Sequence, residues 1–146
     1  MTRAVERSAA WVELAVRTSY RDELLDITEQ VRDAARELGL ADGLAFVYVP
    51  HTTAGVTINE GADPAVRRDI LEALGKIVPE DLPYRHDEGN SPAHVKASLM
   101  GASVLVPVVE GGLRLGRWQS IYLCEFDGPR PRTIWVGAGG SPSLAK

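Results

Sequence analysis

Hydrophobic and polar residues alternate over residues 11–18, the pattern of a strand with one buried face. Apolar runs rich in β-branched and aromatic residues predict further strands at 44–49, 56–59, 103–109, 119–126 and 132–136. After the strand 103–109, Glu110-Gly111-Gly112 predicts a turn, and a strand is expected to resume near Leu113. The pattern therefore predicts six or seven strands.

Two stretches carry apolar residues at helical spacing instead. The first stretch begins after Asp26, a candidate N-cap, and ends at Gly39. The second begins at Asp63-Pro64 and ends before Pro79. A short third helix is expected around 94–100. The apolar positions of the two main helices are Val31, Ala34, Ala35 and Leu38, then Val66, Ile70, Leu71, Leu74 and Ile77.

The order of these elements indicates the fold class. The strands come in pairs and do not alternate regularly with helices, which disfavours a doubly wound parallel sheet. We therefore expect an α+β fold with a mostly antiparallel or mixed sheet. A chain of 146 residues normally forms one domain, so residues 1–146 are predicted to be a single compact domain, with flexible tails at 1–9 and 140–146.

Composition excludes several classes of protein. With 45% hydrophobic and 25% charged residues, the chain is not expected to be disordered, and a net charge of -4 argues against nonspecific binding of nucleic acid. No apolar run approaches the roughly 20 residues of a membrane helix, and no signal peptide is visible at the start. Cys124 is the only cysteine and lies in an apolar run, where a buried inert thiol is expected. We expect a cytoplasmic protein that binds no membrane.

The first candidate for chemistry is His51, which follows the predicted strand 44–49. It precedes Thr52-Thr53-Ala54-Gly55, a turn of small residues. Hydroxyl and backbone N–H groups in such a turn can hold an anion. By itself, this pattern also fits a histidine on a surface loop.

The second candidate lies in the irregular stretch 79–93, since a loop this long inside one domain is often functional. His86 and His94 flank a polar segment that contains Asn90. Imidazoles with nearby oxygen donors can bind a metal, bind a substrate or act in catalysis, and a solvated charged loop is the alternative. Arg85 and Lys96 would supply cations to a phosphorylated ligand.

The third candidate is Trp118-Gln119, followed by Glu125. An indole face can stack on a flat heterocycle and a glutamine amide can bind its edge, although Trp118 alone fits a core residue equally well. Glu125 ends an apolar strand, where burying a carboxylate is costly unless it has a partner.

Several blocks of this sequence resemble the YjbQ-like family, also called the secondary thiamine-phosphate synthase family. They include His51-Thr52-Thr53-Ala54-Gly55 and Gly116-Arg117-Trp118-Gln119, and nearly the whole chain, from Trp11 to about Gly139, is covered. The blocks that match in order and spacing are 51–60, 62–64, 66–69, 78–79, 84–86, 92–99 and 116–125. Many members carry a longer segment between the two loop histidines than residues 87–91 provide here, often with two adjacent aspartates.

The resemblance implies a small α+β fold, a homotrimer and a conserved polar pocket. It also implies a weak ability to join hydroxymethylpyrimidine diphosphate to thiazole phosphate, with release of diphosphate. His51, His86 and His94 would then share a site that holds a phosphorylated metabolite or a divalent metal, Zn or Mg. His86, Arg85 and Glu125 are expected to be catalytic, and the expected substrate-binding residues are Thr52, Thr53, Asn59, Asn90, Lys96, Trp118 and Gln119.

Two other functions fit the same residues. The chain could be a non-catalytic trimeric protein that binds a phosphorylated metabolite or a metal. It could also be a metal-dependent hydrolase of a phosphorylated metabolite. All three functions require cations, imidazoles and an oxygen-rich loop, so the sequence leaves them open.

Overall fold

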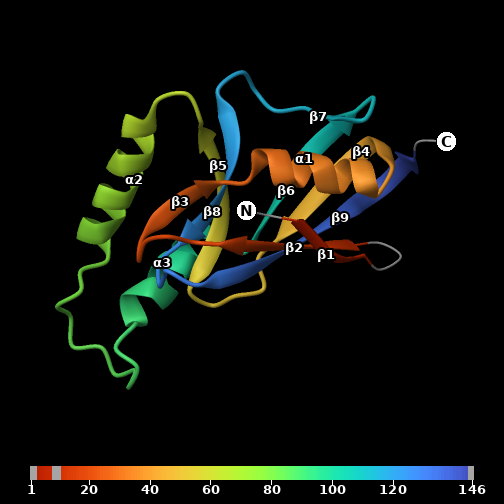
Figure 1. Ribbon diagram of the computed structural model, residues 1–146. Helices are drawn as coiled ribbons and strands as arrows, with labels where there is room; N and C mark the ends of the chain where they lie inside the picture. Colours follow the sequence, from red (N-terminus) through yellow and green to blue (C-terminus); the bar gives the residue numbers. More distant parts are fainter. Residues whose placement is uncertain (1–2, 8–10, 145–146) are drawn as a thin grey trace.

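The computed structural model describes residues 3–7 and 11–144, with the side chains of residues 11–139, and contains three helices and nine strands in that part of the chain (Figure 1). The helices are α1 (Thr28–Glu37), α2 (Pro64–Ile77) and α3 (Ser91–Met100). The strands are β1 (Arg3–Arg7), β2 (Trp11–Arg17), β3 (Glu23–Asp26), β4 (Leu40–Tyr48), β5 (Ala54–Glu60), β6 (Ser103–Val109), β7 (Gly112–Leu113), β8 (Gln119–Glu125) and β9 (Pro131–Leu144).

The larger sheet has six strands in the order β1-β2-β9-β4-β6-β7, and every pair among them is antiparallel. Alternation along each strand places one apolar set toward α1 and the smaller sheet. These buried residues form the main core and are Val12, Leu14, Val16, Ala45, Val47, Val106, Val108, Ile134 and Val136. The apolar face of α1, which includes Val31 and Ala34, packs on them.

The smaller sheet has the order β3-β8-β5 and is buried on both faces. Ile121 and Leu123 of β8 face the main core, whereas Tyr122 and Cys124 point the other way. That second face is covered by α2 and α3, which lie together on one side of the molecule in Figure 1. Burial on both faces explains why β8 reads as a continuous apolar run instead of an alternating one.

The predicted α+β fold with mostly antiparallel sheets is confirmed, and so are the predicted helices. Asp63 caps α2, because its side chain accepts the backbone N–H of Ala65 at 2.9 Å. The short strands β3 and β7 were not predicted, because two to four residues are too few to show a period. Asp26, predicted as a cap, ends β3 and still accepts the backbone N–H of Thr28.

The segments predicted as flexible tails, 1–9 and 140–146, contain strand residues in the part of the chain that the structure describes. Residues 3–7 pair with β2 as strand β1, and β9 continues beside β4 as far as Leu144. Ladder hydrogen bonds to a neighbouring strand order these segments. The remaining residues of the predicted tails lie outside the described part of the chain.

Cys124 is fully buried, as predicted, and burial raises the pKa of its thiol to about 12. The thiol is therefore protonated and inert near neutral pH. None of the described helices is long and apolar enough to cross a membrane.

The outer face of the six-stranded sheet carries a row of aromatic rings. Phe46 lies 5.8 Å from Trp11 and 6.3 Å from Tyr48 between ring centroids, and Tyr48 stacks on Trp135 at 5.6 Å. Trp11, Tyr48 and Trp135 are each more than a third exposed, since no described element packs over this face. Contiguous apolar surface of this kind is typical of a protein–protein interface.

Candidate functional site

His51 lies in the connection between β4 and β5, where the chain passes from the larger sheet to the smaller one. Its Nε2 accepts a hydrogen bond from the backbone N–H of Thr133 on β9 at 2.9 Å. A neutral imidazole that accepts at Nε2 carries its proton on Nδ1. His51 therefore offers an N–H donor, not a lone pair, to a ligand on its other side.

A buried ion pair between Arg132 and Glu125 stabilises this connection. The Arg132 guanidinium forms a bidentate pair with the Glu125 carboxylate, with Nε 2.8 Å from Oε1 and Nη2 in contact with Oε2. The same Nη2 donates to the side-chain hydroxyl of Thr53 at 2.9 Å and to its carbonyl at 3.2 Å. Arg132 thus joins β8 and β9 to the turn that carries His51.

The hydrogen bonds around Glu125 explain how its charge is kept in the core. Burial alone would raise the pKa of this carboxyl, but hydrogen bonds from Arg132, the Asp127 backbone N–H and the Thr18 hydroxyl lower it below its usual value. The partner that the sequence required for a buried Glu125 is therefore Arg132. Both oxygens of Glu125 are occupied within the chain, so it supports the turn without facing a ligand.

Burial and the positive charge of Arg132 lower the pKa of His51 below its usual value of 6.5. The imidazole is consequently neutral at physiological pH. A neutral imidazole with a fixed N–H can donate to an oxygen that gains negative charge, without a proton having to be lost first.

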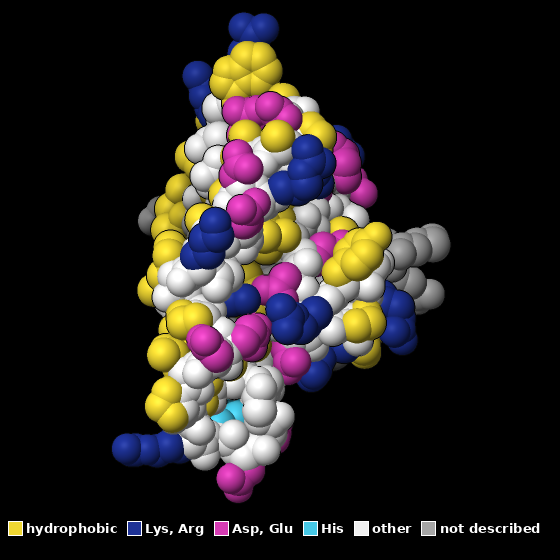
Figure 2. All heavy atoms as spheres, turned by 90° about the vertical axis from the view of Figure 1, so that its left-hand side faces the viewer, with side chains coloured by type: hydrophobic (Ala, Val, Ile, Leu, Met, Phe, Trp, Pro, Cys, Tyr) yellow, Lys and Arg dark blue, Asp and Glu magenta, His cyan; other side chains and the backbone are white. Residues whose placement is uncertain are grey.

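His51 and His94 line the same pocket, which has a volume of about 530 Å³. Its other wall is one side of α3, and the lining residues are His51, Thr52, Ala54, His94, Ala97, Ser98, Gly101 and Ala102. Gly55 lets α3 approach this closely, because a Cβ there would lie 2.6 Å from the Gly101 carbonyl. In Figure 2, imidazole surface is visible in a hollow of the face formed by α2, α3 and the loop that connects them.

His86 joins this group through His94. The two ring centroids are 5.2 Å apart and the rings are nearly perpendicular, so the edge of one imidazole faces the plane of the other. His86 lies on the exposed loop between α2 and α3, with Glu88 4.0 Å from its Nε2. The structure thus brings the three predicted histidines into one region, because His51 and His94 line one pocket and His86 contacts His94.

Two other polar residues predicted near this loop, Lys96 and Asn90, have partners within the chain. The Lys96 ammonium is buried and lies 2.8 Å from the Asp22 carboxylate. The Asn90 side-chain N–H₂ donates to Asp127 at 2.9 Å, while its buried Oδ1 has no partner in the described part of the chain. Arg85 is exposed on the same loop, so it is the predicted cation that faces solvent.

Asn59, Trp118 and Gln119 lie at the other end of the small sheet. β5 pairs with β8 so that Ala54 is opposite Glu125 and Glu60 is opposite Gln119. Six residues of strand separate the two ends, which is roughly 20 Å. Within one chain, these three residues therefore do not meet His51 and His94.

A metal site within one chain is not completed by the residues described. No group of three or more His, Cys, Asp or Glu side chains in the described part of the chain is placed to hold a metal ion. His86 and His94 would supply two ligands, and His51 offers an N–H. Zinc usually takes three or four protein ligands, so this set does not fit a complete zinc site.

Arg132, which holds the turn that carries His51, was missed by the sequence reasoning. The strand 131–136 alternates, and Arg132 shares its buried face with Ile134 and Val136. A charged residue at a buried position of an alternating strand indicates an ion pair, so this signal was available in the sequence.

Comparisons with known proteins agree with the fold. A family model described as "UPF0047 protein YjbQ-like" matches residues 12–141. The chain is 51% identical over 124 residues to UPF0047 protein YugU of Bacillus subtilis, a match that covers 84% of this chain and 94% of that protein. It is 48% identical over 121 residues to a UPF0047 protein of Methanocaldococcus jannaschii, covering 83% and 88%.

Solved structures are similar over the same range. The crystal structure of an uncharacterized conserved protein of the YjbQ/UPF0047 family from Clostridium acetobutylicum has a TM-score of 0.84 and 53% identity, covering 87% of this chain and 98% of that one. A YbjQ-like protein of unknown function from Sulfolobus solfataricus has a TM-score of 0.84 and 31% identity, covering 100% of both chains.

Proposed function

The chain belongs to the YjbQ-like UPF0047 family, and we propose that it is an enzyme whose histidines act on a small phosphorylated metabolite. One observation carries the proposal: His51 and His94 line the same pocket, and His86 contacts His94. Imidazoles are the most frequent groups in acid–base catalysis near neutral pH. Their convergence from three separate segments would be hard to explain by fold stability alone.

The three histidines would have different roles. Nδ1–H of His51 would donate to an oxygen of the substrate, because its Nε2 is held by Thr133. His94, with His86 beside it, would exchange protons with the reacting group. Thr52 lines the pocket and would bind phosphate, and the exposed Arg85 would balance the charge of the leaving group.

The specific reaction that we propose is a slow thiamine-phosphate synthase type of transfer. A carbon–nitrogen bond forms between the thiazole phosphate and the methylene of the pyrimidine, while the carbon–oxygen bond to diphosphate breaks. Diphosphate leaves with the electron pair, so negative charge develops where His86 and Arg85 would stabilise it. Glu125, Thr53, Lys96 and Asn90 would support the site through their buried contacts, without touching the substrate.

Zn²⁺ or Mg²⁺ remains a prediction for this site. With a metal bound, His86 and His94 would supply two ligands in place of the proton transfer described above, and oxygens of the substrate or groups from a second copy would complete the shell.

Assembly into a homotrimer is part of the proposal. The uncovered aromatic face of the six-stranded sheet supports it, since homo-oligomer interfaces are rich in aromatic residues and poor in charge. Asn59, Trp118 and Gln119 would reach the histidine pocket only from another copy, because they lie roughly 20 Å from it within one chain.

A non-catalytic binding protein is the second candidate. It is favoured by the engagement of Glu125 and Lys96 in buried ion pairs, which leaves fewer charges free for catalysis.

The experiment incubates the protein with hydroxymethylpyrimidine diphosphate and thiazole phosphate and measures thiamine phosphate and diphosphate separately. We expect slow formation of both, and a loss of about 100-fold in His94→Ala because general acid–base catalysis contributes 10²–10⁴. Lys76→Ala, on the exposed face of α2, is the control and should retain full activity.

Phosphate release without thiamine phosphate would favour the hydrolase, and thermal stabilisation by either compound without turnover would favour the binding protein. Equal activity in His94→Ala and wild type would contradict the role of the histidines.

A further inference from the structure

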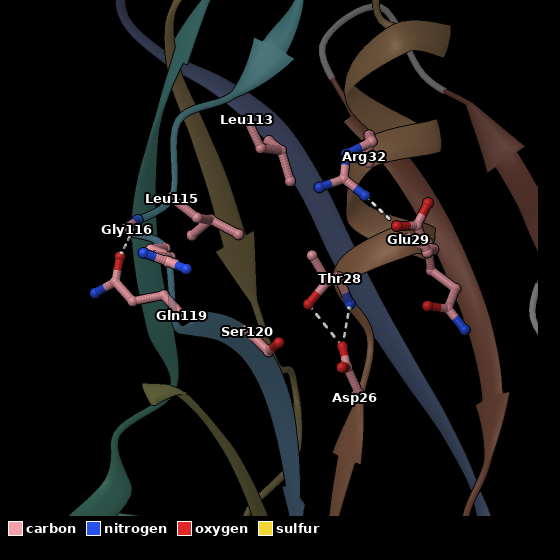
Figure 3. A pocket seen from close by; sticks show the side chains of 11 residues that line it. Asp26, Thr28, Glu29, Arg32, Leu113, Leu115, Gly116, Gln119 and Ser120 are labelled. Atoms are coloured by element: carbon pink, nitrogen blue, oxygen red, sulfur yellow. Dashed lines mark hydrogen bonds and ion pairs between the residues drawn. The ribbon is translucent and has the colours of Figure 1, made fainter. Parts of the chain in front are cut away.

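A second pocket, of about 620 Å³, lies between α1 and the connection from β7 to β8. It shares no lining residue with the histidine pocket, and the β5–β8 register places it at the opposite end of the small sheet. Figure 3 shows Arg32 on one side of this pocket, Leu113 and Leu115 facing it, and Asp26 and Ser120 at its lower end. A pocket of this volume is large enough for a small organic ligand.

The walls are fixed by hydrogen bonds within the chain. The Thr28 hydroxyl donates to Asp26 Oδ1 at 2.6 Å and accepts the backbone N–H of Ile121 at 2.9 Å. On the other wall, the side-chain oxygen of Gln119 accepts the backbone N–H of Gly116 at 2.8 Å. This bond fixes the orientation of the amide, so the Gln119 N–H₂ group is left as a donor.

Among the charged residues that line the pocket, Arg117 is the cation for which the described part of the chain shows no ion pair. Glu29 pairs with Arg32, and Asp26 lies at the N-terminal end of α1, whose partial positive charge compensates it. The Arg117 guanidinium lies 4.8 Å above the Trp118 ring, and no carboxylate in the described part of the chain pairs with it. Arg117 and the Gln119 amide therefore present donors and a positive charge on the same wall.

Apolar surface lies next to these donors. Leu113 and Leu115 line the pocket, and their partly buried side chains pack against the main core. A ligand with an apolar body would cover this surface, whereas a bare inorganic ion would leave it in contact with water.

We propose that this pocket binds a small organic anion, a phosphate or carboxylate carried on a ring-sized apolar body. The anionic group contacts Arg117 and the Gln119 amide, and the body covers Leu113 and Leu115. On the opposite wall Arg32 is already paired with Glu29, so the anionic group is expected beside Arg117 and the ligand has one orientation. The inference goes beyond the histidine pocket and does not depend on the reaction proposed there.

The test is a titration with phenyl phosphate and, separately, with benzoate, followed by ¹H–¹⁵N NMR. We expect saturable shifts of the Gly116 and Gln119 signals with both anions. Benzyl alcohol, which has no charge, and inorganic phosphate, which has no apolar body, should bind much more weakly.

Two arginine variants make the result specific. Arg117→Gln should weaken phenyl phosphate binding about tenfold, because a charge-assisted hydrogen bond is lost. Arg114→Gln changes the same residue type on the same connection, outside the pocket lining, and should change affinity less than about twofold. The proposal is overturned by equal weakening in both variants, by shifts confined to the histidine pocket, or by the absence of saturable binding at millimolar concentrations.

Discussion

His51 and His86 belong to the same proposed site but to very different parts of the fold. His51 lies on a short turn that the buried Arg132–Glu125 ion pair stabilises. Its Nε2 accepts a hydrogen bond from a backbone N–H. His86 lies on the long loop between α2 and α3, with 43% of its side chain exposed. The proposed site therefore combines one imidazole that is fixed by the buried core with one that lies on an exposed loop.

The largest expected effect on the free energy of unfolding comes from breaking the buried ion pair that stabilises the His51 turn. Arg132→Met leaves the Glu125 carboxylate buried without a counter-charge, which should cost about 3–5 kcal/mol in the free energy of unfolding. Arg130→Met is the matched control, because Arg130 is half exposed and pairs with Asp127 on the surface, where a pair is worth about 0–1 kcal/mol. Urea denaturation measures both. Similar losses in the two variants would show that the buried pair does not stabilise the His51 turn.

Low pH should weaken the same ion pair between Glu125 and Arg132. The pKa of Glu125 in the folded chain lies below its usual value of 4.5, because Arg132, Asp127 and Thr18 bind the charged form. The contribution of Glu125 to stability is therefore complete above pH 4.5 and is lost as the pH falls through the folded-state pKa. Replacing both partners, in Glu125→Leu/Arg132→Met, should remove that component from the pH dependence of stability. An unchanged acid limb in this double variant would assign it to other carboxylates.

The smallest expected effect on stability is at the loop. His86→Ala removes an exposed side chain and should change the free energy of unfolding by less than about 0.5 kcal/mol. The same substitution should nevertheless reduce turnover, since His86 contacts His94 in the proposed site. Thermal unfolding and product formation, measured on one preparation, separate the two effects. A stability loss comparable to that of Arg132→Met would show that the loop is a structural element.

Periodicity in the sequence predicted most of the fold, and the reasons for the exceptions are physical. The helices and the longer strands repeat often enough to show their period, whereas β3 and β7 are too short. The partner of Lys96 is Asp22, which is 74 positions away in the chain, and no local pattern predicts such a pair. Lys96 was therefore predicted to bind phosphate, although its ammonium is held in an internal ion pair.

The site was predicted unevenly for the same reason. His86 and His94 are eight positions apart, so their approach could be predicted from the loop between them. The separation of Gln119 from His51 depends on the antiparallel register of β5 and β8, which only the folded chain defines. Resemblance to the family grouped these residues into one site, and the register places them at opposite ends of one sheet.

The most direct test of the histidine site follows the three imidazoles by ¹H–¹³C NMR while diphosphate is added, with and without Mg²⁺. If the account is right, the signals of His51 and His94 shift together with a single dissociation constant, and His86 follows them. Lys76→Ala, on the exposed face of α2, should leave this titration unchanged. Shifts of His51 and His94 with different midpoints, or a response of His86 alone, would contradict a shared site.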